Sequence, residues 1–249
     1  MLPFDENLGL GVLILVTATL YASVGQAGAT GYLAVMGLAG LDPAVMKPTA
    51  LALNIVVALI GTAQFWRAGL FRWRNFYPFG VLGFPFSILG GAIHLPAHAY
   101  YPIVGALLLI AAFQLARPAR QQDAGKLPPA APPFFLSLLT GAAIGFVSGV
   151  TGTGGGVFLA PVILLMNWVE IRHAAAVTAA YNLLNSVAAL LGAYATLRAL
   201  PPVLPWWLVA AAIGGAIGAT FGNRYLPDKA LRHILAALLA VSGTKLILF

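Results

Sequence analysis

The feature that most constrains this chain is a series of long apolar segments separated by short polar ones. A helix needs about 20 mostly apolar residues to cross the hydrocarbon core of a bilayer. Segments of this kind cover roughly 8–40, 44–66, 75–93 and 98–116, and then 134–169, 174–196, 204–222 and 229–248. The pattern predicts an all-α integral membrane protein that crosses a lipid bilayer several times.

Charge is too scarce for a soluble protein. Asp, Glu, Lys and Arg make up 8% of the 249 residues, against about 25% in an ordinary soluble domain. This composition excludes a soluble enzyme, a nucleic-acid-binding module and a disordered chain. The net charge of +7 comes from basic residues between apolar segments, where they orient helices in a membrane. We therefore expect no nucleic-acid partner.

A polar stretch divides the apolar segments into two sets of four. Residues 117–133 hold five prolines and most of the local charge, which predicts an extended linker. We expect a first membrane repeat over 1–116, a Pro-rich cytoplasmic linker over 117–133 and a second membrane repeat over 134–249.

Matching residues in the two sets indicate an internal repeat. Tyr32-Leu33-Ala34 matches Phe158-Leu159-Ala160, and Asn54 falls opposite Asn182. Further matches are Gly83 and Gly91 with Gly214 and Gly222, and Leu95-Pro96 with Leu226-Pro227. Their common order along the chain supports two homologous halves.

The first segment of each half is too long for one straight crossing and contains a run of glycines. These runs are 25–31 and 149–156. Glycine costs a helix about 1 kcal/mol per residue, and non-helical backbone at membrane depth must be buried in protein or line a cavity. We expect each first segment to form a hairpin of two short helices, followed by three transmembrane helices.

The basic residues test this expectation. With hairpins, one face receives ten of them, Arg67, Arg72, Arg74, Arg117, Arg120, Lys126, Arg172, Arg224, Lys229 and Arg232. The other face receives Lys47, Arg198 and Lys245. Single crossings would give a split of eight to five. The positive-inside rule favours ten to three, which predicts inverted repeats, a cytoplasmic ten-charge face and both termini outside.

The glycine breaks are the first candidates for a binding site. A half-helix that starts at a break offers free backbone N–H groups and the positive end of its dipole to an anion. The candidate residues are Thr151, Gly152, Thr153, Gly154, Gly155 and Gly156 in the second half, and Gln26 and Gly28, with Thr30, in the first. The alternative is close helix packing, which we expect for Gly141, Gly145 and Gly149 and for Gly214, Gly218 and Gly222.

Asn54 and Asn182 complete the candidate site, because each is a polar residue inside an apolar segment. Hydrogen bonding between helices is the alternative role. The chain has no Cys and no paired carboxylates at membrane depth, and its four His lie near segment ends. We therefore expect no metal, no cofactor and no catalytic residues. Lys47 and His173 precede corresponding helices and are candidates to attract an anion at the entrances.

The second glycine run, from Ser148 to Pro161, resembles the signature of the sulfite exporter TauE/SafE family of membrane anion transporters. The first run departs from it, since it lacks three adjacent glycines and has Val35 where the second has Pro161. The resemblance implies a multi-pass transporter of the inner membrane that exports sulfite, sulfoacetate or related organosulfonates.

Other functions remain open at this point. A passive anion channel and a transporter of a non-sulfur organic anion fit the same pattern. An intramembrane enzyme built on Ser148 is disfavoured, because no His lies at clear membrane depth to act as its base. For a secondary transporter, the sequence leaves open a proton or sodium as coupling ion, the direction of transport and the oligomeric state.

Overall fold

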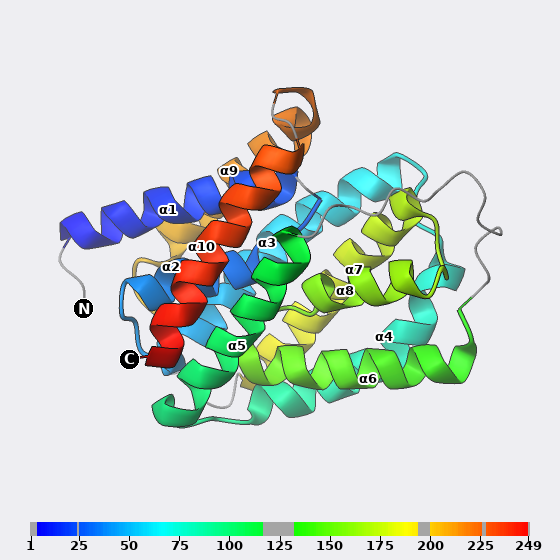
Figure 1. The fold of residues 1–249 in the computed structure, drawn as a ribbon, viewed down its shortest axis with the longest axis horizontal. Helices are drawn as coiled ribbons and strands as arrows, with labels where there is room; N and C mark the ends of the chain where they lie inside the picture. The colour runs from blue at the N-terminus through cyan, green and yellow to red at the C-terminus, as the bar shows by residue number, and fades with distance from the viewer. Residues whose placement is uncertain (1–3, 24, 117–131, 194–199, 226–227, 249) are drawn as a thin grey trace.

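The computed structural model describes residues 4–23, 25–116, 132–193, 200–225 and 228–248, which form helices with short connections and no strand (Figure 1). The helices are α1 (Phe4–Ser23), α2 (Ala29–Leu38), α3 (Pro43–Arg67), α4 (Trp73–Ala92), α5 (Ala97–Ala116), α6 (Phe134–Thr151), α7 (Gly156–Leu165), α8 (Ile171–Ala193), α9 (Leu204–Tyr225) and α10 (Asp228–Leu248). Nearly all of the expected linker lies outside the described residues, as do Arg198 and the pair Leu226-Pro227.

The surface of the helices is apolar, as a lipid-facing surface must be. Phe135 and Trp206 are 80% and 75% exposed, and contiguous apolar patches of this kind are rare on soluble monomers. Helices α3, α5 and α6 and residues His173–Ala193 of α8 are long and apolar enough to cross a membrane. The prediction of an all-helical membrane protein is confirmed.

Each glycine-broken segment folds back on itself. In the first half, a side chain at Gly31 of α2 would touch Thr17 and Tyr21 of α1, and the Tyr21 hydroxyl lies 3.0 Å from that of Thr30. In the second half, Gly155 at the start of α7 lies against Ile144 of α6.

The expectation of two short helices in each hairpin was wrong for the first helix. Helices α1 and α6 have 20 and 18 residues, and only α2 and α7, with 10 each, are half-length. The reason is the position of the glycines, which follow a full-length apolar stretch and leave only about ten residues for the return.

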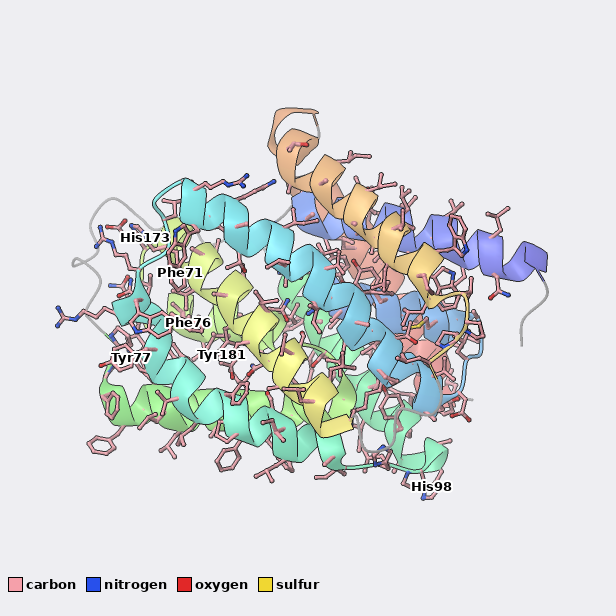
Figure 2. The ribbon with its side chains drawn as sticks, turned by 180° about the vertical axis from the view of Figure 1, so that it is seen from behind. Phe71, Phe76, Tyr77, His98, His173 and Tyr181 are labelled. Atoms are coloured by element: carbon pink, nitrogen blue, oxygen red, sulfur yellow. The ribbon has the colours of Figure 1, made fainter. Side chains whose placement is uncertain are left out.

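The ends of α2 and α10 lie together, as the hairpin topology requires. The Lys245 ammonium near the end of α10 donates to the Leu38 carbonyl at the end of α2, at 2.6 Å. These two ends would lie on opposite faces if each first segment crossed the membrane once. Figure 2 shows His173, Phe71 and Tyr77 toward one end of the molecule and His98 toward the other, in agreement with the hairpin topology.

The first helix of each half packs on the fourth helix of the other half. Helix α1 packs on α9 and α6 packs on α4, while α3 packs on α8 and α5 on α10. Two halves related by a two-fold axis would show such reciprocal packing, because the axis relates the α1–α9 contact to the α6–α4 contact. This exchange of contacts supports the inverted repeat that we propose for the two halves.

Small residues allow these helices to approach closely, as expected. A side chain at Gly141, Gly145 or Gly149 of α6 would collide with α4 backbone carbonyls, those of Phe79, Gly83 and Ser87. In the other half, Gly214 and Gly218 of α9 meet the α1 carbonyls of Leu15 and Thr19. The packing role is confirmed for these five glycines, while the surroundings of Gly222 lie outside what the structure describes.

Candidate functional site

Asn54, in the middle of α3, connects the two halves at the glycine breaks. Its Oδ1 accepts the N–H of Ala29, the first residue of α2, at 3.0 Å. Its Nδ2 donates to Asn182 Oδ1 at 3.0 Å and to Ser186 Oγ at 2.7 Å, both on α8. Both N–H groups of the amide are thereby used, and the side chain is fully buried. Asn54 therefore holds the start of α2 against α8.

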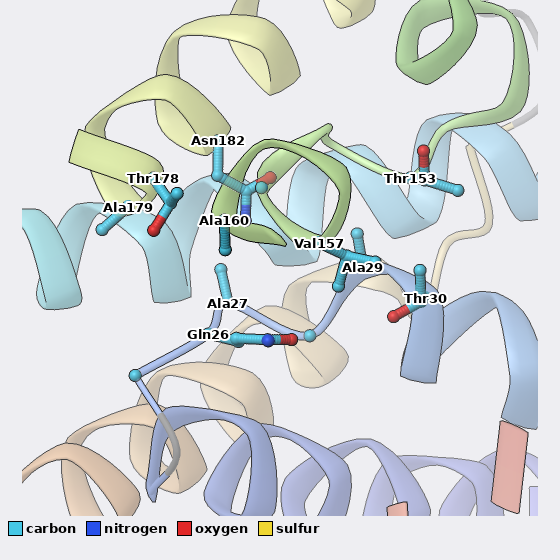
Figure 3. A pocket seen from close by; sticks show the side chains of 13 residues that line it. Gln26, Ala27, Ala29, Thr30, Thr153, Val157, Ala160, Thr178, Ala179 and Asn182 are labelled. Atoms are coloured by element: carbon cyan, nitrogen blue, oxygen red, sulfur yellow. The ribbon is translucent and has the colours of Figure 1, made fainter. Parts of the chain in front are cut away.

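Asn182 is the asparagine of the second half that corresponds to Asn54, but its environment is different. Its Oδ1 accepts from Asn54, which fixes the orientation of the amide. Its side chain lines a cavity (Figure 3), and no acceptor for its Nδ2 is recorded among the described residues. Asn182 therefore presents amide N–H donors to the cavity.

This central cavity lies between the two glycine breaks and α8. It is lined by Gly25, Gln26, Ala27, Gly28, Ala29, Thr30, Thr153, Gly156, Val157, Ala160, Thr178, Ala179 and Asn182. The lining contains no charged side chain. The cavity measures about 20 Å³, which is space for about one water molecule. A larger ligand enters only if the walls move apart.

Two half-helices begin at this cavity. Helix α2 follows Gly28, at φ 93°, and α7 follows Gly155, at φ 83°. These left-handed conformations favour glycine. No acceptor is recorded within the described chain for the N–H groups of Thr30, Gly156 and Val157, which line the cavity. The cavity therefore receives the positive ends of two helix dipoles together with unpaired donors.

Thr151 and Thr153 have hydroxyl groups that bond within the protein. Thr151 Oγ1 donates to Val147 O at 2.7 Å and lies 3.1 Å from Thr153 Oγ1. A hydroxyl has one hydrogen, so Thr153 is the donor in the second contact. Of the two, only Thr153 lines the cavity. The hydroxyls of Thr151 and Thr153 are therefore not free donors, unlike the Asn182 amide and the backbone N–H groups described above.

The glycines of the second break lie close to the asparagines. A Cβ at Gly154 would collide with Asn182 Oδ1 and Asn54 Nδ2. A Cβ at Gly155 would lie 3.0 Å from Asn185 Nδ2, and one at Gly152 would lie 3.2 Å from Lys47 Cγ. Neighbouring side chains therefore fill the space that a Cβ at Gly154 or Gly155 would need.

The structure thus divides the ten predicted site residues into two groups. Those that line the cavity are Gln26, Gly28, Thr153, Gly156 and Asn182. Those that do not line it are Asn54, Thr151, Gly152, Gly154 and Gly155.

Sequence reasoning missed Thr178, which lines the cavity, and Ser186, which accepts from Asn54. Both lie four residues from Asn182, so they share its face of α8. That spacing was the signal that could have identified them.

Lys47 and His173 are bonded to backbone rather than free at the entrances. The Lys47 ammonium donates to the carbonyls of Gly91 and Ile93, at 2.8 and 2.9 Å, at the end of α4. It lines a second cavity of about 260 Å³, together with Asp42, His94 and Tyr100. His173 Nδ1 lies 2.7 Å from the Leu70 carbonyl. In this structure both residues fasten helix ends.

Comparison with known proteins places the chain among membrane transporters. The model of the family described as "Sulfite exporter TauE/SafE" matches residues 10–246. A probable membrane transporter protein of Sinorhizobium fredii, y4hK, is 56% identical over 97% of this chain and 98% of its own. Another from Bacillus subtilis, YjnA, is 28% identical over 94% of this chain and 96% of its own. No solved structure matches the chain significantly.

Proposed function

Because the chain belongs to the sulfite exporter TauE/SafE family, we propose that it exports small sulfur-containing anions across the inner membrane. Sulfite, sulfoacetate and related organosulfonates are the proposed substrates. The protein is a membrane transporter and not an enzyme, like the members of its family.

One observation gives the strongest support for an anion-binding site. Two half-helix N-termini, from different halves of the chain, open on one cavity that has no charged side chain. Each N-terminus carries about half a positive charge, and the Asn182 amide adds side-chain donors. A sulfonate group has three oxygens that accept hydrogen bonds, which suits donors arriving from several directions.

The absence of a cation in the lining suits a transporter. A buried lysine or arginine would hold an anion by a full charge, and release would then require breaking a buried ion pair. Dipoles and neutral donors bind an anion more weakly. The anion can therefore leave once the walls of the cavity separate.

The size of the cavity favours a carrier over a passive channel. A cavity of about 20 Å³ has room for about one water molecule, so the passage of an anion requires its walls to move. We propose that the half-helices α2 and α7 move relative to α3 and α8 and open the cavity to one face at a time. Such movement of repeats about a central site is common in secondary transporters, and it would be coupled to a proton or sodium gradient.

The test is a binding and transport series on the purified full-length protein. Calorimetry with sulfite, sulfoacetate, taurine, thiosulfate and sulfate should give saturable binding of at least one sulfur anion. Proteoliposomes should then show saturable uptake that responds to a proton or sodium gradient. Non-saturable flux would indicate a channel, and a lack of binding by all five compounds would contradict a sulfur-anion substrate.

A further inference from the structure

One polar atom next to the central cavity does not fit a site that holds only an anion. Gln26 lines the cavity, and its Oε1 is buried with no hydrogen-bond partner among the described residues. An amide oxygen is an acceptor with two lone pairs. Leaving such an atom buried and unpaired costs about 1–3 kcal/mol, so it indicates a missing donor.

The other side-chain oxygens around the cavity already have partners. Thr30 Oγ1 pairs with the Tyr21 hydroxyl at 3.0 Å, Thr153 Oγ1 with Thr151 Oγ1 at 3.1 Å, and Thr178 Oγ1 with Ala174 O at 2.9 Å. Thr153 and Thr178 use their single hydroxyl hydrogen in these bonds, and no contact between the Thr30 hydroxyl and the Gln26 oxygen is recorded among the described residues. Figure 3 shows Asn182 on one side of the cavity and Gln26 on the other.

The two sides of the cavity therefore require different hydrogen-bonding groups from a ligand. The Asn182 amide and the half-helix N-termini offer N–H donors, which match the oxygens of an anion. In the orientation that the amide has here, the Gln26 oxygen needs a donor and repels a group that carries only lone pairs. A sulfonate without a hydrogen accepts hydrogen bonds from the Asn182 side. On the opposite side, its oxygen faces the Gln26 oxygen, and the two acceptors repel each other. An anion that keeps one hydrogen satisfies both.

We infer that Gln26 makes the cavity selective for anions that carry a hydrogen-bond donor next to their charged group. Hydrogensulfite, the protonated form of sulfite, is the smallest sulfur anion of this class. The inference rests on the proposed function, because it assumes that the anion binds in this cavity. It adds two details to that function: a residue that determines specificity, Gln26, and the protonation state of the anion that binds.

A matched pair of probe anions isolates the hydrogen. Methanesulfonate and monoprotonated methylphosphonate have nearly the same shape and both carry one negative charge at mildly acidic pH. They differ in that only the phosphonate has an O–H group. Binding of each to the purified full-length protein is measured by calorimetry, for the wild type, for Gln26→Leu and for Gln114→Leu. Gln114 is a partly buried glutamine of α5 that does not line the cavity.

The expected result is a change in selectivity. Gln26→Leu should weaken methylphosphonate binding roughly tenfold, the loss of one hydrogen bond. It should leave methanesulfonate unchanged or bound more tightly, because the oxygen that opposed it is gone. Gln114→Leu should change neither. Thermal unfolding reports whether Gln26→Leu is folded, and Gln26→Met, which also lacks the amide, replaces it if it is not.

Three outcomes would overturn the inference. Equal weakening of both anions would mean that Gln26 donates to the anion through its amide nitrogen. Unchanged binding of both would mean that a water molecule satisfies the oxygen in every state. Loss of sodium-dependent binding in the variant, without a change in selectivity, would assign the oxygen to a cation. If the wild type binds no anion of any kind, the proposed function fails as well.

Discussion

Asn54 and Asn182 stand at related positions of the two halves but have different tasks at the site. The amide of Asn54 is fully engaged with Ala29, Asn182 and Ser186. The amide of Asn182 gives only its oxygen to the protein and lines the cavity with the rest. The symmetry of the sequence therefore does not extend to the roles of these two side chains.

We predict that Asn54→Leu lowers stability and that Asn182→Leu lowers binding. The first leaves the Ala29 N–H and Asn182 Oδ1 unsatisfied, at roughly 1–3 kcal/mol for each buried group. The second removes donors from the cavity, which should weaken binding of sulfite or sulfoacetate roughly five- to 150-fold. Thermal unfolding and calorimetry on both variants separate the effects. An unchanged affinity in a folded Asn182→Leu protein would contradict the assigned donor.

The second glycine break shows how an element depends on the absence of a side chain. Gly154 has φ 73° and its missing Cβ would fall on the amides of Asn54 and Asn182. Gly40 also has φ 73° but has nothing within 4 Å. The two glycines share the backbone conformation and differ only in the space around them.

We predict that Gly154→Ala abolishes anion binding, whereas Gly40→Ala does not. Both substitutions place a side chain in the left-handed region, at a cost of about 1–2 kcal/mol. Only the first also displaces the asparagine pair. Calorimetry and thermal unfolding of both variants test this. Equal loss of binding in the two would show that backbone strain alone, rather than crowding of the site, accounts for the effect.

At the end of α4, the ammonium of Lys47 neutralises carbonyls that have no partner in their own helix. We predict that Lys47→Met lowers the unfolding temperature and leaves anion affinity and its dependence on salt unchanged. Lys245→Met, which removes the corresponding contact at the end of α2, should behave alike. If Lys47→Met instead weakens binding mainly at low ionic strength, the lysine attracts the anion at the entrance.

At the scale of the whole molecule, the ten-to-three split of basic residues predicts which end of the bundle faces the cytoplasm. The expected linker would lie inside the cell, and the α4–α5 connection with exposed His98 would lie outside. The chain has no cysteine, so single cysteines can be introduced on a clean background. In intact cells, an impermeant thiol reagent should label His98→Cys and spare Ala124→Cys. The opposite labelling would reverse the proposed orientation.

The sequence alone predicted the fold class, the position of both glycine breaks and most of the polar residues that line the central cavity. Apolar length, glycine content and a polar residue in an apolar run are local properties, and in a membrane each has few structural solutions because backbone groups must be satisfied internally. The length of α1 and α6 was harder to predict, since glycine content does not fix where a helix ends.

Only the tertiary structure decided what each candidate does. The sequence could not separate Asn54 from Asn182, because the difference depends on whether a neighbouring helix supplies a partner. In the same way, Lys47 binds the end of α4, which lies 43 to 46 residues further along the chain. The buried Gln26 oxygen has no hydrogen-bond partner within the part of the chain that the structure describes. Hydrogen bonds reach only about 3 Å, so the role of a buried polar group depends on contacts between distant segments, which sequence spacing does not specify.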